Sequence, residues 1–194
     1  NTNGNGYLAE AILPQNTAKI KISLKNEKRT DVVLALTTLK LHYTYEFGNG
    51  VLIDTCKNCS IQNMIIKDCT GDCAGTSATF FKGATVDDCR IIGCTLENAR
   101  RQGISFTGDG NNFLVKDCNI GKINGVDPQC GIDFESYGVT TNTIIDNCKF
   151  YDNKKWDIVN YDGTNIEIKN SNFTGAIATT HGHTMNIHHN KFEY

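Results

Sequence analysis

Short apolar strings, separated by polar turns, recur along most of the chain. Each string ends at a small or polar residue, here called the anchor, and in five of six cases an apolar residue follows two positions later. Successive anchors are 25, 24, 30, 23 and 19 residues apart. A period of this length, holding two or three short strands, is typical of one coil of a parallel β-solenoid. The anchors are Cys69, Cys94, Cys118, Cys148, Ser171 and Asn190.

A second apolar string follows most anchors, with a weaker copy at residues 77–81. If the coils stack, equivalent residues lie about 4.8 Å apart and form ladders. One coil cannot bury its apolar face alone, so stacking creates the interior. We therefore expect an all-β parallel β-helix, with the anchor residues in one column at a corner. The predicted internal ladder consists of Ile104, Ile132, Ile158 and Ile177.

Two other architectures have similar periods. Leucine-rich repeats need a dense leucine pattern, which is missing here. A β-sandwich or propeller predicts tight hairpins, and the pairs Asn124-Gly125 and Asp162-Gly163 would suit them. The same pairs fit solenoid corners. Residues 1–50 lack a clear repeat and are predicted to form an irregular N-terminal cap, with the coils in residues 51–194.

Composition supports strands and turns over helices. Ile outnumbers Leu by 20 to 10, and β-branched side chains pack well on a pleated surface. The 22 Asn and 18 Gly residues supply turns, because both tolerate left-handed backbone. The nine cysteines are an odd number and most lie in apolar strings, so we interpret them as reduced core thiols.

Charge and hydropathy exclude two classes of partner. The net charge is −2 and the isoelectric point about 6.2, which argues against a basic nucleic-acid-binding protein. There is no apolar run of 18 residues, so we expect no membrane insertion.

Two strings in successive coils carry a family resemblance: Asn98-Ala-Arg-Arg-Gln-Gly-Ile-Ser105 and Gly125-Val-Asp-Pro-Gln-Cys-Gly-Ile-Asp-Phe-Glu135. They resemble the pectate-lyase-like right-handed parallel β-helix superfamily, particularly bacteriophage tail spikes and tail appendages. The resemblance covers about residues 50–194. It implies a right-handed helix, a cell-surface polysaccharide as partner, and a homotrimer. It also implies a location in the virion tail after assembly in the host cytoplasm, with an extracellular location as the alternative.

Alternation along Gly131–Glu135 places Ile132 and Phe134 inside the helix. Asp133 and Glu135 then face outward, about 7 Å apart along the backbone. Neighbouring carboxylates perturb each other's protonation, as acid and base roles require. Aligning the isoleucines adds further polar side chains to this face: Asp157, Tyr161, Arg101, Gln129 and Lys155.

Glycoside hydrolysis needs two carboxyl groups, roughly 5 Å apart for retention and 6.5 to 9.5 Å for inversion. We predict Asp133, Glu135 and Asp157 as the catalytic carboxyls, one acting as acid and another as base or nucleophile. Arg101, Gln129, Lys155 and Tyr161 are the predicted substrate-binding residues. Three alternatives stay open: carboxylates that only keep the helix soluble, a binding module without turnover, and a polysaccharide lyase.

Two groups of residues have metal-ligand spacing. The pairs Cys56/Cys59 and Cys69/Cys73 are spaced like a zinc knuckle, but Cys69 belongs to the predicted inward ladder. The histidines at positions 181, 183, 188 and 189 form a second group, which we interpret as exposed turn and strand residues. We therefore predict neither a metal nor a cofactor.

Overall fold

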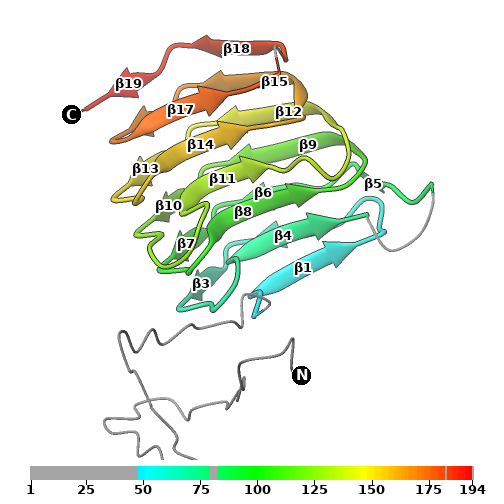
Figure 1. Cartoon of the computed structure of the whole chain (residues 1–194), viewed down its shortest axis with the longest axis horizontal. Coiled ribbons are helices and arrows are strands. Elements are labelled where there is room, and N and C mark those ends of the chain that lie inside the picture. The colour runs from blue at the N-terminus through cyan, green and yellow to red at the C-terminus, as the bar shows by residue number, and fades with distance from the viewer. Residues whose placement is uncertain (1–47, 79–82, 182, 194) are drawn as a thin grey trace, which may run out of the picture. The chain divides into compact units, whose positions relative to one another are not determined.

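The structure is a computed structural model that describes residues 48–78, 83–181 and 183–193. These residues belong to one unit, residues 42–194. Its strands form three parallel sheets, and the chain passes through each sheet once per coil (Figure 1). In the described part of the chain, no helix has the length and apolar character needed to cross a membrane. The predicted cap falls almost wholly on residues 1–47, which lie outside the described residues.

Sheet A carries the candidate site, and its strands stack one above another in Figure 1. Sheets B and C complete each coil. Sheet A consists of β1 (Val51–Asp54), β4 (Ala74–Ser77), β8 (Gln102–Thr107), β11 (Cys130–Phe134), β14 (Trp156–Asn160) and β17 (Ala176–Thr179). Sheet B consists of β2 (Ser60–Gln62), β6 (Arg90–Ile92), β9 (Gly110–Lys116), β12 (Thr140–Asp146), β15 (Thr164–Lys169) and β18 (Met185–His188), with β5 (Val86–Asp87) paired to β9. Sheet C consists of β3 (Ile65–Lys67), β7 (Thr95–Glu97), β10 (Asn119–Gly121), β13 (Lys149–Tyr151), β16 (Asn172–Phe173) and β19 (Lys191–Phe192).

The predicted isoleucine ladder is confirmed. Ile132 pairs with Ile104 on one side and Ile158 on the other, and Ile158 pairs with Ile177. Phenylalanines stack in the same way, with the rings of Phe106 and Phe134 4.9 Å apart. Every strand pair is parallel in the described residues, so the hairpin architectures are excluded.

The corners explain the abundance of asparagine. At the corner between sheets B and C, Asp117, Asn147 and Asn170 all have positive φ, between 53° and 54°. This left-handed conformation is costly for most residues, and Asn and Asp tolerate it best after glycine. The side chains also join the coils, because Asn147 Nδ2 donates to Asp117 Oδ1 at 2.6 Å.

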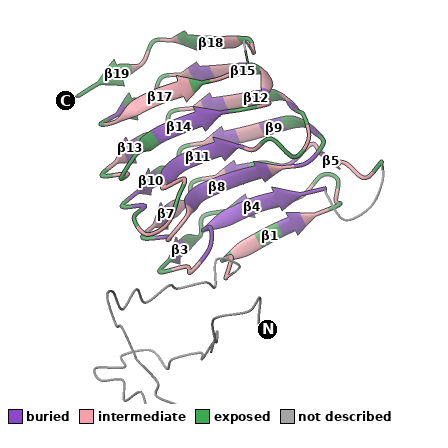
Figure 2. Cartoon of the chain, viewed as in Figure 1, coloured by how far each residue is buried: buried purple, intermediate pink, exposed green. Residues whose placement is uncertain are grey.

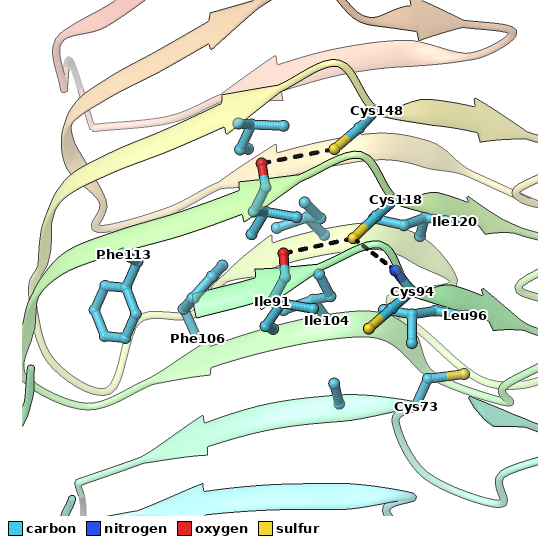
Figure 3. Packing of buried hydrophobic residues seen from close by; sticks show 14 of the residues in the cluster. Cys73, Ile91, Cys94, Leu96, Ile104, Phe106, Phe113, Cys118, Ile120 and Cys148 are labelled. Carbon is cyan, nitrogen blue, oxygen red and sulfur yellow. Dashed lines mark hydrogen bonds between the residues drawn. The ribbon is translucent and has the colours of Figure 1, made fainter. Parts of the chain in front are cut away.

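The residue after each of these turns is the predicted anchor. Cys94 N donates to Cys118 Sγ at 3.5 Å, and Cys148 N donates to Ser171 Oγ at 3.0 Å (Figure 3 shows the cysteines). Ser171 N continues the column by donating to Asn190 Oδ1 at 2.8 Å. The position therefore favours a compact side chain that accepts a hydrogen bond from the preceding coil.

The prediction that Cys69 belongs to the column of anchors is wrong. Met64 occupies the anchor position of the first complete coil, because Thr95 N bonds to Met64 O just as Asn119 N bonds to Cys94 O. Cys69 lies one corner further along, where its carbonyl accepts from Arg100 N. The apolar string before Cys69 is interrupted by the turn at Asn63, and the sequence pattern does not reveal this break.

Candidate functional site

The central strands of sheet A are buried on both faces, whereas the strands of sheets B and C mix buried residues with exposed ones. Every residue of β4 and β11 is buried, and Figure 2 shows the central strands of this sheet as almost continuously buried. Ile132 and Phe134 fill the interior, so Asp133 projects outward, as predicted. Asp133 is nevertheless only 3% exposed, and it pairs with Ser105 on the neighbouring strand.

Gln102 forms hydrogen bonds with both predicted carboxyls, Asp133 in β11 and Glu135 directly after this strand. Its Nε2 atom donates to Asp133 Oδ2 at 2.5 Å and to Glu135 Oε1 at 3.0 Å. The two oxygens are therefore separated by no more than the sum of these distances, about 5.5 Å. Ser105 Oγ donates to the same Glu135 oxygen at 3.4 Å. Two carboxyls are thus held at a fixed short separation.

Arg101 lies on the other side of this pair. Its Nη2 atom is 3.4 Å from Glu135 Oε1, and its Nη1 atom is 3.8 Å from Asp72 Oδ2. The Asp72 side chain is only 4% exposed. The site therefore contains three carboxyls close to one guanidinium, and the third is Asp72.

Sequence reasoning missed Asp72 because it missed the coil that carries it. The sequence pattern places the weak copy at residues 77–81, whereas the structure pairs Ala74 with Ile104 and Ser77 with Thr107. The string Ala74-Gly75-Thr76-Ser77 contains no large apolar residue, so it gives little periodic signal. Gln102 was missed for a different reason: a neutral amide between two strings does not stand out as a catalytic group.

The prediction that Asp157 joins this face is wrong. Asp157 Oδ1 accepts a hydrogen bond from Asn153 Nδ2 at 2.9 Å, and Oδ2 accepts one from Gly175 N at 2.6 Å. It occupies the same register position as Gly131, where an added Cβ would lie 2.9 Å from Phe150 Cδ1. This position faces the interior and corner, so the carboxyl of Asp157 holds turns together, and burial raises its pKa.

The predicted binding residues divide into two groups. Tyr161 follows β14 in the register position of Glu135 and lines the same pocket as Arg101. Gln129 and Lys155 stack in the column of Arg101, as aligned, but their side chains turn to the preceding loop. Gln129 Nε2 donates to Gly125 O at 2.9 Å, and Lys155 Nζ lies 2.7 Å from Asp127 Oδ1.

A pocket of about 270 Å³ opens over these residues. Arg101, Asp133, Glu135 and Tyr161 line it together with Asp127, Pro128, Ser136 and Tyr137. The pocket is close to the lower limit, roughly 300 Å³, of sites that hold drug-sized ligands.

Asp133 has the perturbed proton affinity expected of an acid. Burial raises its pKa, and the nearby Glu135 charge raises it further, to about 7. The Gln102 hydrogen bond and the Arg101 charge oppose this shift only in part. Asp133 Oδ1 is buried without a hydrogen-bond partner in the described part of the chain, as suits a carboxyl that holds a proton.

Three stacked parallel sheets with an acid-lined pocket on one outer face define a β-helix protein with a candidate site built across successive coils. The family model described as "Right handed beta helix region" matches residues 28–193, so the chain belongs to this family. The fold predicted from the repeat and the β-helix family predicted from the resemblance of the two longer strings are confirmed.

Two proteins of Bacillus subtilis (strain 168) are similar in sequence. The uncharacterized protein YclG is 31% identical over 153 residues, which cover 72% of this chain and 26% of that protein. The SPbeta prophage-derived uncharacterized protein YorA is 27% identical over 163 residues, covering 76% of this chain and 28% of that protein. The chain thus spans about a quarter of the length of these relatives.

One solved structure is also similar. It is the tailspike protein gp49 from Acinetobacter baumannii bacteriophage Fri1, a capsular polysaccharide depolymerase. The identity is 15% and the TM-score 0.32, covering 66% of this chain and 33% of that one.

Proposed function

We propose that this chain is part of a phage tail-spike-like protein that binds a host cell-surface polysaccharide in the sheet A pocket and hydrolyses it. The observation that carries the proposal is Asp133, a buried carboxyl with a pKa raised to about 7, held beside Glu135 in a pocket. A carboxylic acid that keeps its proton near neutral pH is the group that glycosidases use to protonate the leaving oxygen.

The separation of the two carboxyls favours retention of configuration. The upper limit of about 5.5 Å between Asp133 Oδ2 and Glu135 Oε1 is closer to the roughly 5 Å separation of retaining enzymes than to the 6.5 to 9.5 Å of inverting ones. Asp133 gives its proton to the glycosidic oxygen as the C–O bond breaks, and Glu135 forms the glycosyl ester. Water then cleaves the ester, with Asp133 taking the water's proton.

The charges around the pocket favour a neutral sugar over a uronate. Asp72, Asp133, Glu135 and Asp127 contribute carboxyls, while Arg101 and Lys155 are already engaged with Glu135, Asp72 and Asp127. A lyase needs a cation free to neutralise the uronate carboxylate, so the lyase is the weaker alternative. Tyr161, about a third exposed, and the more exposed Tyr137 offer faces on which a sugar ring can stack.

The assignment to a virion tail and to a homotrimer follows from the resemblance in sequence, and the prophage origin of one relative supports the phage connection.

A binding module without turnover is the second candidate. The burial of Asp133 favours this second candidate. A catalytic acid must reach the glycosidic oxygen, and Asp133 is only 3% exposed. In that case the pocket recognises the sugar through Arg101 and Tyr161, and the carboxyls only accept hydrogen bonds from hydroxyls.

Release of reducing ends from purified host polysaccharides, with binding measured in parallel, separates the candidates. Hydrolysis predicts that Asp133→Asn and Glu135→Gln each lower the rate at least about 100-fold while binding persists. Glu167→Gln, a matched change on sheet B, should leave the rate unchanged. Binding without release by the unchanged protein would establish the binding module, and neither binding nor release would refute both candidates.

A further inference from the structure

Two consecutive turns at the far end of sheet A bring three metal-ligand side chains together. Asp162 lies in the turn between β14 and β15, and His181 and His183 lie in the turn between β17 and β18. Each offers one ligand atom, and the three atoms all lie within 4.8 Å of one another. Among the described residues, no other group of three His, Cys, Asp or Glu side chains meets this condition.

Coil stacking creates this proximity. Thr180 N donates to Asn160 O at 2.9 Å, so the second turn leaves sheet A directly above the first. His181 adopts left-handed backbone, with φ of 56°, and its Nδ1 atom lies 3.2 Å from Tyr161 O. Residues some twenty positions apart in sequence are thus neighbours across one coil.

Two of the three separations match those of ligands around one small cation. His183 Nε2 is 3.3 Å and His181 Nδ1 is 3.5 Å from the same oxygen, Asp162 Oδ1. In a tetrahedral site with bonds of about 2.0 to 2.1 Å, adjacent ligand atoms are about 3.3 Å apart. A metal ion can therefore replace these contacts with small side-chain movements.

We propose that Asp162, His181 and His183 bind one divalent transition-metal ion of the zinc class. Imidazole nitrogens with a carboxylate oxygen suit Zn²⁺, Co²⁺ or Ni²⁺, whereas Ca²⁺ and Mg²⁺ prefer oxygen ligands. The side chain of His181 is 62% exposed, so an ion enters from solvent and water completes its coordination. The ion links two successive coils. None of its three ligands lines the sheet A pocket, so the proposal goes beyond the hydrolase function.

A second group of similar composition provides the matched control. His188 Nε2 is 3.0 Å from Glu167 Oε1, and its Nδ1 atom is 2.6 Å from His189 Nδ1. This group also has two histidines and one acid, but its ligand atoms do not all lie within 4.8 Å of one another. Any binding that reflects histidine content alone would involve both groups.

Equilibrium dialysis of the untagged protein against Zn²⁺ tests the proposal, with Co²⁺ absorption as a second readout. We expect one Zn²⁺ per chain and the intense visible bands of four-coordinate Co²⁺. The double variant His181→Gln/His183→Gln should bind at least about tenfold more weakly. The control His188→Gln/His189→Gln should bind within about twofold of the unchanged protein.

Thermal unfolding in EDTA checks that the variants are folded, and we expect equal midpoints for all three proteins. Zn²⁺ should raise the midpoint of the unchanged protein and of the control but not of the His181/His183 variant, because a ligand stabilises only the state that binds it. Equal Zn²⁺ affinity in the two double variants, or loss of binding in the control, would overturn the proposal. If the His181/His183 variant does not fold, Asp162→Asn serves in its place, with the same expected loss.

Discussion

At the scale of single residues, the buried carboxyl of Asp133, which we propose as the acid, carries a cost to stability. Its pKa is about 7 in the folded chain against 3.8 as the ordinary value, so between these pH values the folded state binds more protons than the unfolded state. The free energy of unfolding therefore falls as pH rises through this range. The full shift corresponds to about 4 kcal/mol at pH values above 7.

Removing this carboxyl should stabilise the protein at high pH. Asp133→Asn keeps the size of the side chain and abolishes its ionisation, so it should raise the free energy of unfolding by about 3 kcal/mol more at pH 8 than at pH 5. Urea unfolding at the two pH values measures the difference. Asp152→Asn, the same change at an exposed position, is the control. An equal effect of Asp133→Asn at pH 5 and at pH 8 would mean that Asp133 is already ionised in the folded chain at pH 5.

At the scale of strands and turns, the interior ladders hold the coils together. Ile132 is fully buried between Ile104 and Ile158, so Ile132→Ala leaves a cavity in the stack. We expect a loss of about 2 to 5 kcal/mol in the free energy of unfolding, measured by urea titration. Ile65→Ala, at a position 71% exposed, should cost less than about 0.5 kcal/mol. Similar losses for the two variants would contradict the stacked interior.

The corner asparagines make a separate contribution. Asn147 has φ of 53° and donates to Asp117 Oδ1 in the preceding coil. Replacement by alanine removes this bond and forces left-handed backbone on a residue that disfavours it, so Asn147→Ala should cost about 1 to 2 kcal/mol. Asn147→Gly keeps the backbone conformation and should cost less. Thermal unfolding of the two variants compares them, and a glycine variant less stable than the alanine variant would refute the role of the backbone.

The sequence predicted the parts of the fold that repeat. The isoleucine ladder and the anchors from Cys94 onward recur in the same order in every coil, so their stacking could be deduced without coordinates. Ala74–Ser77 was not predicted because small residues carry no periodic signal. Asp157 was misplaced because the pairing of β14 with β17 is irregular between Trp156 and Ile158, and simple alternation does not anticipate such a break.

At the scale of the molecule, the chemically distinctive side chains gather where strands of sheet A end. Glu135, Tyr161 and His181 each follow directly or closely after a strand of this sheet, in successive coils. Glu135 and Tyr161 could be placed at this edge from the sequence alone. The burial of Asp133 and the contact of Asp72 with Arg101 could not, because both depend on packing between coils. The chain spans about a quarter of the length of its two Bacillus subtilis relatives.

The anomeric form of the first sugar released from a host polysaccharide tests the central claim most directly, because the claim combines cleavage with a short carboxyl separation. Proton NMR during digestion should show new reducing ends with the anomeric configuration of the cleaved bond, and none with Asp133→Asn. Inverted products, unsaturated products, or undiminished release by Asp133→Asn would contradict the account.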